Sequence, residues 1–312
     1  MGSLEGFTPA DFDAFAQNKW CSHAFNRARL EVKLKLNALG KELVQVLSPK
    51  LEGEQSKVTE ERPSIFNQHQ VKHLTLYFIR SEKERNLLEG ILDRSKSVAE
   101  MVNDPALHHK HIILGIRLSQ QGIEAGLWLH RDAWVDWKNV VQRCREHWDL
   151  DRLGELLRAL PDSILHVRGG GFFDAPSTPL RQMGTQALLD AFQQEGPWTI
   201  LGEKRDRLDP LCASSDLLPW MSGLLDSLLP LLHFIRWRGE NDFHELKDVL
   251  KGQKQKAEQR FTSIKVGDEV RVTKGLGSGK TVVVESLERK GVAKVWIGSM
   301  LISLKIEDLA AL

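Results

Sequence analysis

Apolar residues recur at intervals of three and four over two long stretches of the chain, which is the spacing of a single helix face. The first stretch, Ala24 to Leu47, has Lys and Glu between its apolar positions and predicts a long amphipathic helix. The second stretch, Ser214 to Arg236, is strongly apolar and contains Pro219 and Pro230. We therefore expect a core helix there that is kinked or split, and not a membrane span.

Strand-forming residues dominate Val71 to Ile79, where alternate positions are apolar. Further on, His111 to Leu118 and Ile123 to His130 flank the turn Ser119 to Gly122 and predict an antiparallel hairpin at the centre of a sheet. The polar stretch Glu52 to Pro63 predicts an exposed loop. The same patterns predict helices over 81–98, 132–146, 150–160 and 179–194, and short strands over 163–167 and 198–201. This mixture of helices and mainly antiparallel strands indicates an α+β domain.

The last 50 or so residues change to the two-residue period of β-strands, with apolar and polar positions alternating over 270–273, 293–297 and 302–306. Glycines separate these stretches, and glycine accepts the φ angles of sharp turns, so we expect a small all-β, SH3-like barrel. Between residues 243 and 262 the chain is rich in Lys, Gln and Glu without an apolar stripe. We therefore predict an α+β domain (1–242), a helical linker (243–262) and a barrel (263–312).

Two segments of the barrel region carry a family resemblance, namely Lys265-Val266-Gly267-Asp268-Glu269-Val270-Arg271-Val272 and Gly298-Ser299-Met300-Leu301-Ile302. They resemble a KOW-like domain, most closely the one in the MutS-related proteins that also carry a C-terminal Smr nuclease domain. Neither a MutS ATPase nor an Smr domain is recognisable in this chain. What the resemblance implies is contact with RNA, DNA, ribosomes or transcription machinery.

Charge is unevenly distributed, although the net charge is only +1. Residues 251–312 hold 12 Lys and Arg against 7 Asp and Glu, whereas residues 1–250 hold 31 against 35. The basic C-terminal region permits an anionic partner, with phosphate contacts from basic residues and a stacking surface from tryptophan. The candidate nucleic-acid-binding residues are Arg271, Lys274, Lys280, Arg289, Lys290, Lys294 and Trp296. The alternatives are that the barrel docks on another protein or on its own large domain.

Gly277-Ser278-Gly279-Lys280-Thr281 has the ending of a phosphate-binding loop, but we exclude that function. The motif requires a glycine where Lys274 stands, and a strand-like run of valines follows where a helix is needed. No catalytic motif is recognisable elsewhere in the sequence.

The spacing of the histidines and cysteines along the chain does not match that of a metal site. We expect His108-His109-Lys110-His111 to be a solvated turn and not a metal site, because adjacent residues rarely point at one ion and no acidic cluster is near in sequence. Cys21, Cys144 and Cys212 are far apart and are expected to be buried thiols. We predict no metal and no cofactor. His73, Arg117, His130 and Arg168 lie on predicted strands and could converge into an anion-binding pocket.

The large domain carries a second resemblance through four segments, which are residues 6–15, 36–43, 198–202 and 228–232. They resemble a bacterial cytoplasmic family of unknown function, whose members are α+β proteins with a curved antiparallel sheet that is distantly TBP-like. The resemblance implies a curved sheet with packed helices and a cytoplasmic location. It implies no catalytic residue.

Three functions follow from these patterns. The leading hypothesis is a non-enzymatic nucleic-acid or ribonucleoprotein binding protein with RNA or DNA as its partner, and without a membrane. The second is an enzyme that acts on a phosphorylated or nucleic-acid substrate in a pocket of the large domain. The third is a protein-interaction adaptor that self-associates through the apolar segment Leu217 to Leu232. The polar N-terminal residues lack the pattern of a secretory signal, so we expect the protein in the cytoplasm.

Overall fold

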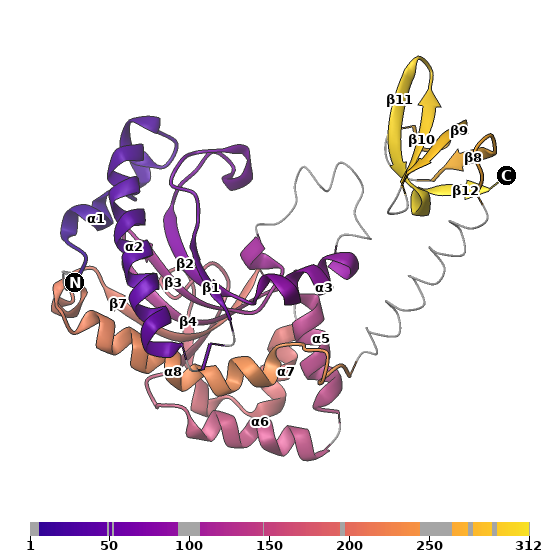
Figure 1. Ribbon diagram of the computed structural model, residues 1–312. Coiled ribbons are helices and arrows are strands. Elements are labelled where there is room, and N and C mark those ends of the chain that lie inside the picture. Colours follow the sequence, from indigo (N-terminus) through magenta and orange to yellow (C-terminus); the bar gives the residue numbers. More distant parts are fainter. Residues whose placement is uncertain are drawn as a thin grey trace. The chain divides into compact units, whose positions relative to one another are not determined.

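The chain divides into two compact units in the computed structural model, which describes residues 6–48, 50–51, 53–92, 107–145, 147–193, 197–243, 264–273, 277–288 and 292–311. The large unit comprises residues 1–86 and 105–244, and the small unit comprises residues 87–104 and 245–312. Figure 1 shows both units, and each is described by itself below. The predicted linker, residues 243–262, lies almost wholly outside the described residues.

The large unit is built on a seven-stranded antiparallel sheet with the strand order β1-β2-β3-β4-β7-β5-β6. Its strands are β1 (Gln55–Val58), β2 (His73–Ile79), β3 (Ile113–Ser119), β4 (Gly122–His130), β5 (Leu165–Arg168), β6 (Ser177–Pro179) and β7 (Trp198–Asp206). The predicted hairpin is confirmed, because Leu118 of β3 pairs with Ile123 of β4 and both strands lie inside the sheet.

Helices cover one face of this sheet (Figure 1). The described helices are α1 (Pro9–Asp13), α2 (Asn26–Leu47), α3 (Glu82–Leu92), α5 (Trp134–Arg143), α6 (His147–Ala159), α7 (Thr185–Gln193) and α8 (Leu217–Ile235). Helix α2 packs against β1 and β2, and α8 packs against β3 and β4 and against α2. The predicted stripe on α2 is buried at Val32, Leu36, Leu39 and Leu43, whereas Leu34 is exposed. Periodicity therefore places the helix correctly, and packing decides the edges of its buried face.

The opposite face of the sheet carries a separate apolar cluster, because alternate strand residues point to opposite faces. On β2, Leu76 and Phe78 belong to the core under the helices, whereas Tyr77 and Ile79 belong to the second cluster. The full second cluster is Tyr77, Ile79, Ile113, Trp128, Val167, Phe172, Trp198 and Ile200. Within this cluster the rings of Trp128 and Trp198 pack edge to face, with their centroids 5.6 Å apart.

The structure corrects one expectation for the large unit and decides a second. The predicted loop Glu52 to Pro63 contains the edge strand β1, whose polar sequence has no strand signal and which exists because β2 supplies its hydrogen bonds. Of the two alternatives predicted for 214–236, the split is excluded, because α8 is one continuous helix of 19 residues that contains Pro219 and Pro230. Pro219 lies in the first turn, where a backbone N–H has no helical partner in any case. By length and composition alone, α8 is long and apolar enough to cross a membrane, as some core helices of soluble proteins are.

The small unit contains a five-stranded antiparallel sheet with the order β11-β10-β9-β8-β12. Its strands are β8 (Glu269–Val272), β9 (Thr281–Glu288), β10 (Val292–Ile297), β11 (Met300–Lys305) and β12 (Leu309–Ala311). The predicted alternation is confirmed, because Val270, Val272, Ala293, Val295 and Ile297 are all buried in one apolar cluster. Thr281 begins β9, so the phosphate-loop-like segment runs into a strand and the exclusion of that motif is confirmed.

Candidate functional site

The outward-facing surface of the small sheet collects residues from four strands. Residues that pair directly across antiparallel strands share a face, so Trp296 lies beside Leu301, and Arg271 lies beside Thr281. Trp296 is 46% exposed, and Leu301 and Val283 are exposed to a similar degree. The surface therefore offers one aromatic ring within a short apolar row. We call it the Trp296 face.

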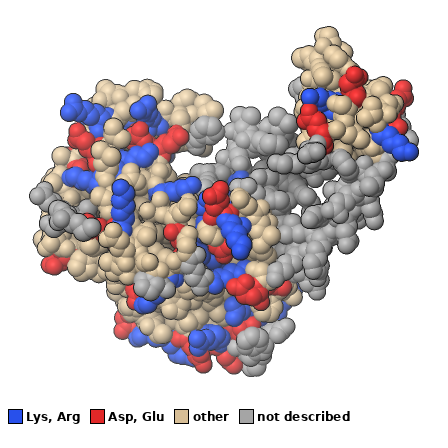
Figure 2. Space-filling model, in the orientation of Figure 1, with Lys and Arg blue, Asp and Glu red and all other residues tan. Residues whose placement is uncertain are grey.

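Two acidic side chains hold polar groups of the Trp296 face. The indole Nε1 of Trp296 donates to Glu285 Oε2 at 3.2 Å, and Lys294 Nζ lies 2.6 Å from Glu288 Oε1. Acidic and basic side chains both occur on the side of the small unit that Figure 2 shows. Residues 263–312 contain eight Lys and Arg against six Asp and Glu, so more than half of the C-terminal basic surplus belongs to residues 251–262. The predicted barrel, residues 263–312, therefore supplies less than half of the net positive charge expected to attract a nucleic acid.

The other predicted nucleic-acid-binding residues have different outcomes. Arg271 and Lys280 are exposed. Lys274, Arg289 and Lys290 lie outside the described residues.

Three glycines lie side by side on the second face of the large sheet. Gly115 pairs with Gly126, and Gly126 pairs with Gly202, across β3, β4 and β7. A side chain at Gly126 would collide with the carbonyl oxygen of Leu201, so the strands approach closely there. The indole of Trp128 lies directly over Gly115, because a Cβ atom there would be 3.3 Å from the ring.

Arg117 fills the space beside this glycine row. Its guanidinium stacks over the Trp128 ring at 4.2 Å, and its Nη1 donates to Glu124 Oε2 at 3.2 Å and to the Gly170 carbonyl. Burial raises the pKa of the Glu124 carboxyl, while Arg117 acts in the opposite direction. Arg117 is therefore already balanced by a carboxylate and a π system, and it lends little positive charge to an anion.

The predicted anion pocket is present only in part, because His130 and Arg168 line one small pocket whereas His73 and Arg117 do not line it. His73, Arg117 and His130 belong to the second face, where burial holds the pKa of His73 well below its usual range and leaves it uncharged at neutral pH. Arg168 pairs with Thr199, whose hydroxyl donates to the Ala191 carbonyl of α7, so Arg168 lies on the α7 side of the sheet. There it lines a small pocket, which is formed by Leu129, His130, Arg131, Arg168, Ala191, Phe192 and Thr199.

Three histidines and an aspartate meet at the end of β4, next to Trp198. His109, in the short 3-10 helix η4 (Leu107–His109), stacks on His130 with ring centroids 4.2 Å apart. Trp198 contacts His130 edge to face at 4.7 Å, and His108 lies 4.4 Å from His109. His130 Nδ1 lies 3.4 Å from Asp132 Oδ2. The ligand atoms of His109, His130 and Asp132 all lie within 4.8 Å of one another.

Protonation states in this cluster follow from burial. Desolvation, followed by the neighbouring imidazoles, lowers the pKa of His108 to about 3 and that of His109 to about 4. Interaction with the neighbouring His130 ring lowers the pKa of the Asp132 carboxyl. At neutral pH the cluster therefore presents uncharged imidazole from His109 and an ionised carboxylate from Asp132.

This arrangement overturns the expected solvated turn at His108 to His111. His108 packs on Tyr77 at 4.9 Å, His109 packs on His130, and His111 is buried. The hairpin itself carried the missed signal. Ile113 pairs with Trp128, so residues just before β3 must lie near residues just after β4. Cys21 also differs from expectation, because it is exposed while Cys144 and Cys212 are buried.

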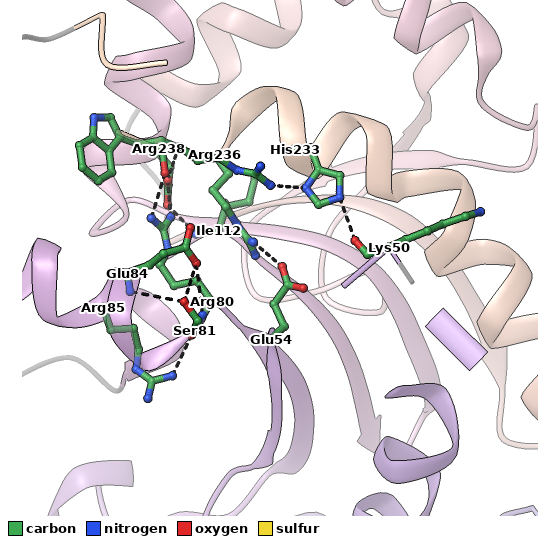
Figure 3. Close-up of polar contacts among 12 residues, drawn as sticks. Lys50, Glu54, Arg80, Ser81, Glu84, Arg85, Ile112, His233, Arg236 and Arg238 are labelled. Atoms are coloured by element: carbon green, nitrogen blue, oxygen red, sulfur yellow. Dashed lines mark hydrogen bonds and ion pairs between the residues drawn. The ribbon is translucent and has the colours of Figure 1, made fainter. Parts of the chain in front are cut away.

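A second polar cluster joins α8 to the sheet edge and is shown in Figure 3. Arg80 Nη2 donates to Asp136 Oδ1 at 2.6 Å, and Arg80 Nη1 donates to the Trp237 carbonyl at 3.1 Å. Arg236 pairs with Glu54, and both side chains are buried. The cluster ties the chain that leaves α8 to β2 and α5. Arg80 and Arg236 are each paired with a carboxylate within the protein, which assigns these two ion pairs a structural role.

Comparison of the sequence with models of known protein families gave no match, and comparison with curated proteins gave none either.

Proposed function

We propose that this chain is a non-enzymatic nucleic-acid or ribonucleoprotein binding protein that makes its contacts through the small unit, an SH3-like barrel of the KOW type. The Trp296 face is the observation that carries the proposal. A half-exposed indole on a rigid sheet is a stacking platform for an unpaired base, and Glu285 holds its orientation through the Nε1 hydrogen bond. The favoured partner is single-stranded RNA or DNA, because bases in a duplex are already stacked.

Exposed basic side chains of the small unit support the proposal. Arg271 and Lys280 are exposed and available for phosphate contacts. The ion pair between Lys294 and Glu288 has side chains that are 38% and 45% exposed, and a surface pair of this kind contributes only about 0–1 kcal/mol. A phosphate can therefore compete with Glu288 for Lys294. The basic residues of 251–262 add attraction that depends on salt concentration.

Fluorescence anisotropy with labelled single-stranded RNA, single-stranded DNA and duplex DNA tests this proposal in the full-length chain. We expect Trp296→Ala to weaken single-strand binding about 5- to 150-fold, since stacking contributes about 1–3 kcal/mol per base. Arg271→Gln should weaken binding less and reduce its salt dependence. The matched control is Leu301→Ala, which removes an exposed apolar side chain from the same row without removing a stacking surface. Absence of binding at low salt, or equal binding by Trp296→Ala and wild type, would contradict the proposal.

Docking of a protein on the Trp296 face is the second candidate. It is favoured by the exposed apolar side chains Val283, Met300 and Leu301 around Trp296. A protein partner would lose affinity with Leu301→Ala as well as with Trp296→Ala, which separates it from base stacking. The self-association alternative loses its basis, because Leu217, Leu224, Leu228 and other leucines of α8 are buried in the core.

A further inference from the structure

We propose that His109, His130 and Asp132 bind one divalent transition-metal ion of the Zn²⁺ class in the large unit. The three side chains supply two imidazoles and one carboxylate, and they leave one or more coordination positions open. The proposed site lies in a different unit from the Trp296 face and does not depend on the nucleic-acid proposal.

The three ligand atoms are already close, and one ring has to turn for an ion to bind. His109 leaves its stack on His130 in doing so, because two parallel imidazole rings cannot both direct a nitrogen lone pair at one ion. The three ligand atoms lie within 4.8 Å of one another, whereas ligands of a tetrahedral zinc ion at about 2.0–2.1 Å stand about 3.3 Å apart. His109 and Asp132 are partly exposed and have room to rotate. His130 is buried and is the last residue of β4, so it forms the fixed corner of the site.

Contacts around the ligands position them before an ion arrives. Trp198 contacts the rings of both His109 and His130, at 5.2 Å and 4.7 Å. The backbone N–H of Asp132 donates to His130 Nδ1 at 3.2 Å. This hydrogen bond holds residue 132 next to the His130 ring. Packing of this kind keeps the three ligand side chains close together before an ion binds.

The donor set suits a transition-metal cation. Two imidazoles and one carboxylate are ligand types that Zn²⁺ accepts, and the carboxylate of Asp132 supplies negative charge. Imidazole ligands favour transition metals over Mg²⁺ and Ca²⁺, which prefer oxygen ligands.

Another pair of side chains in the same unit can capture zinc and must be removed for the test. Cys21 and His23 are both exposed and only two residues apart. The experiment therefore uses the full-length chain with Cys21→Ser as its background. Binding of Zn²⁺ is measured by isothermal titration calorimetry, and Co²⁺ is measured by visible absorption and by quenching of tryptophan fluorescence.

In this background we expect one Zn²⁺ per chain, and we expect His109→Gln and Asp132→Asn each to weaken binding more than about 100-fold, beyond the usual cost of changing an outer-shell partner. Bound Co²⁺ should quench tryptophan fluorescence, since Trp198 contacts both histidines. The matched control, His23→Gln, should bind Zn²⁺ as the background does. These variants change partly exposed side chains, and circular dichroism verifies that they fold. Absence of Zn²⁺ binding in the Cys21→Ser background, or binding by His109→Gln or Asp132→Asn as tight as that of the background, would overturn the proposal.

Discussion

Asp136 accepts three hydrogen bonds at the centre of the buried cluster between α5, β2 and the end of α8. The donors are Arg80 Nη2 at 2.6 Å, the Trp237 N–H at 2.8 Å and the Ile112 N–H at 2.9 Å. Both side chains of the ion pair are almost completely buried, at 0% and 1% exposure. A buried guanidinium depends on its carboxylate, because no water replaces the lost partner.

We expect Asp136→Asn to lower the free energy of unfolding of the large unit by about 3–5 kcal/mol, as removal of one partner from a buried ion pair usually does. The amide keeps the side-chain shape but leaves the charge of Arg80 uncompensated. Urea unfolding followed by tryptophan fluorescence measures the effect, because eight of the nine tryptophans lie in residues 1–243. The matched control is Asp151→Asn at an exposed position of α6, which should change stability by less than about 0.5 kcal/mol. Equal losses in the two variants would contradict the structural role of Asp136.

Two glycines of the large unit differ in whether the surrounding structure has room for a side chain. Gly126 lies in β4 where the backbone of β7 approaches closely, and a methyl group there would collide with the Leu201 carbonyl oxygen. Gly223 lies in α8, is exposed, and faces open space where the Cβ of another residue would lie. The same substitution should therefore have opposite effects at these two sites.

Gly223→Ala is expected to stabilise the large unit by about 0.5–1 kcal/mol, because alanine loses less backbone entropy than glycine in a helix. Gly126→Ala is expected to destabilise it by about 3 kcal/mol or more, at the upper end of overpacking costs, because backbone and not a flexible side chain has to move. Unfolding in urea compares the two variants with the wild type. A tolerated Gly126→Ala would show that β4 and β7 are not as closely spaced as the structure has them.

Elements differ in how well periodicity alone predicts them. Helix α2 and the hairpin of β3 and β4 follow from their patterns, because a repeat of 3.6 or 2 residues is a local property of the chain. Strand β1 has four residues, Gln55 to Val58, without such a repeat, and it forms because β2 provides a partner. Strand β7 runs to Asp206 although the predicted strand ends at Leu201, since β4 pairs with it along its whole length.

Acid sensitivity is a property of the whole large unit. Burial lowers the pKa of His108 to about 3 and that of His109 and His166 to about 4, and it holds the pKa of His73 and His111 well below the usual range. In the unfolded chain these groups titrate near 6.5. Below pH 6.5 the unfolded chain therefore binds more protons than the folded one, and stability falls as the pH decreases from 6.5 to about 4.

His166→Gln should reduce this loss by about 1–2 kcal/mol between pH 6.5 and pH 5, because one histidine with a lowered pKa is removed and its side chain is almost fully buried. Urea unfolding at a series of pH values gives the difference, and the change with pH is the quantity compared. The matched control, His23→Gln, removes an exposed imidazole. A pH dependence in His166→Gln that equals the wild type's would contradict this origin of the acid sensitivity.

The sequence by itself determined the class of elements, the central hairpin and the alternation inside the small sheet, because each of these is encoded by spacing between near neighbours. Only the tertiary structure decided which polar residues meet. Arg80 and Asp136 are 56 positions apart, and Trp237 and Asp136 are 101 apart. His109 precedes β3 and stacks on His130 at the end of β4. No local repeat specifies such contacts, since they depend on how whole elements pack and on which buried charges then require partners.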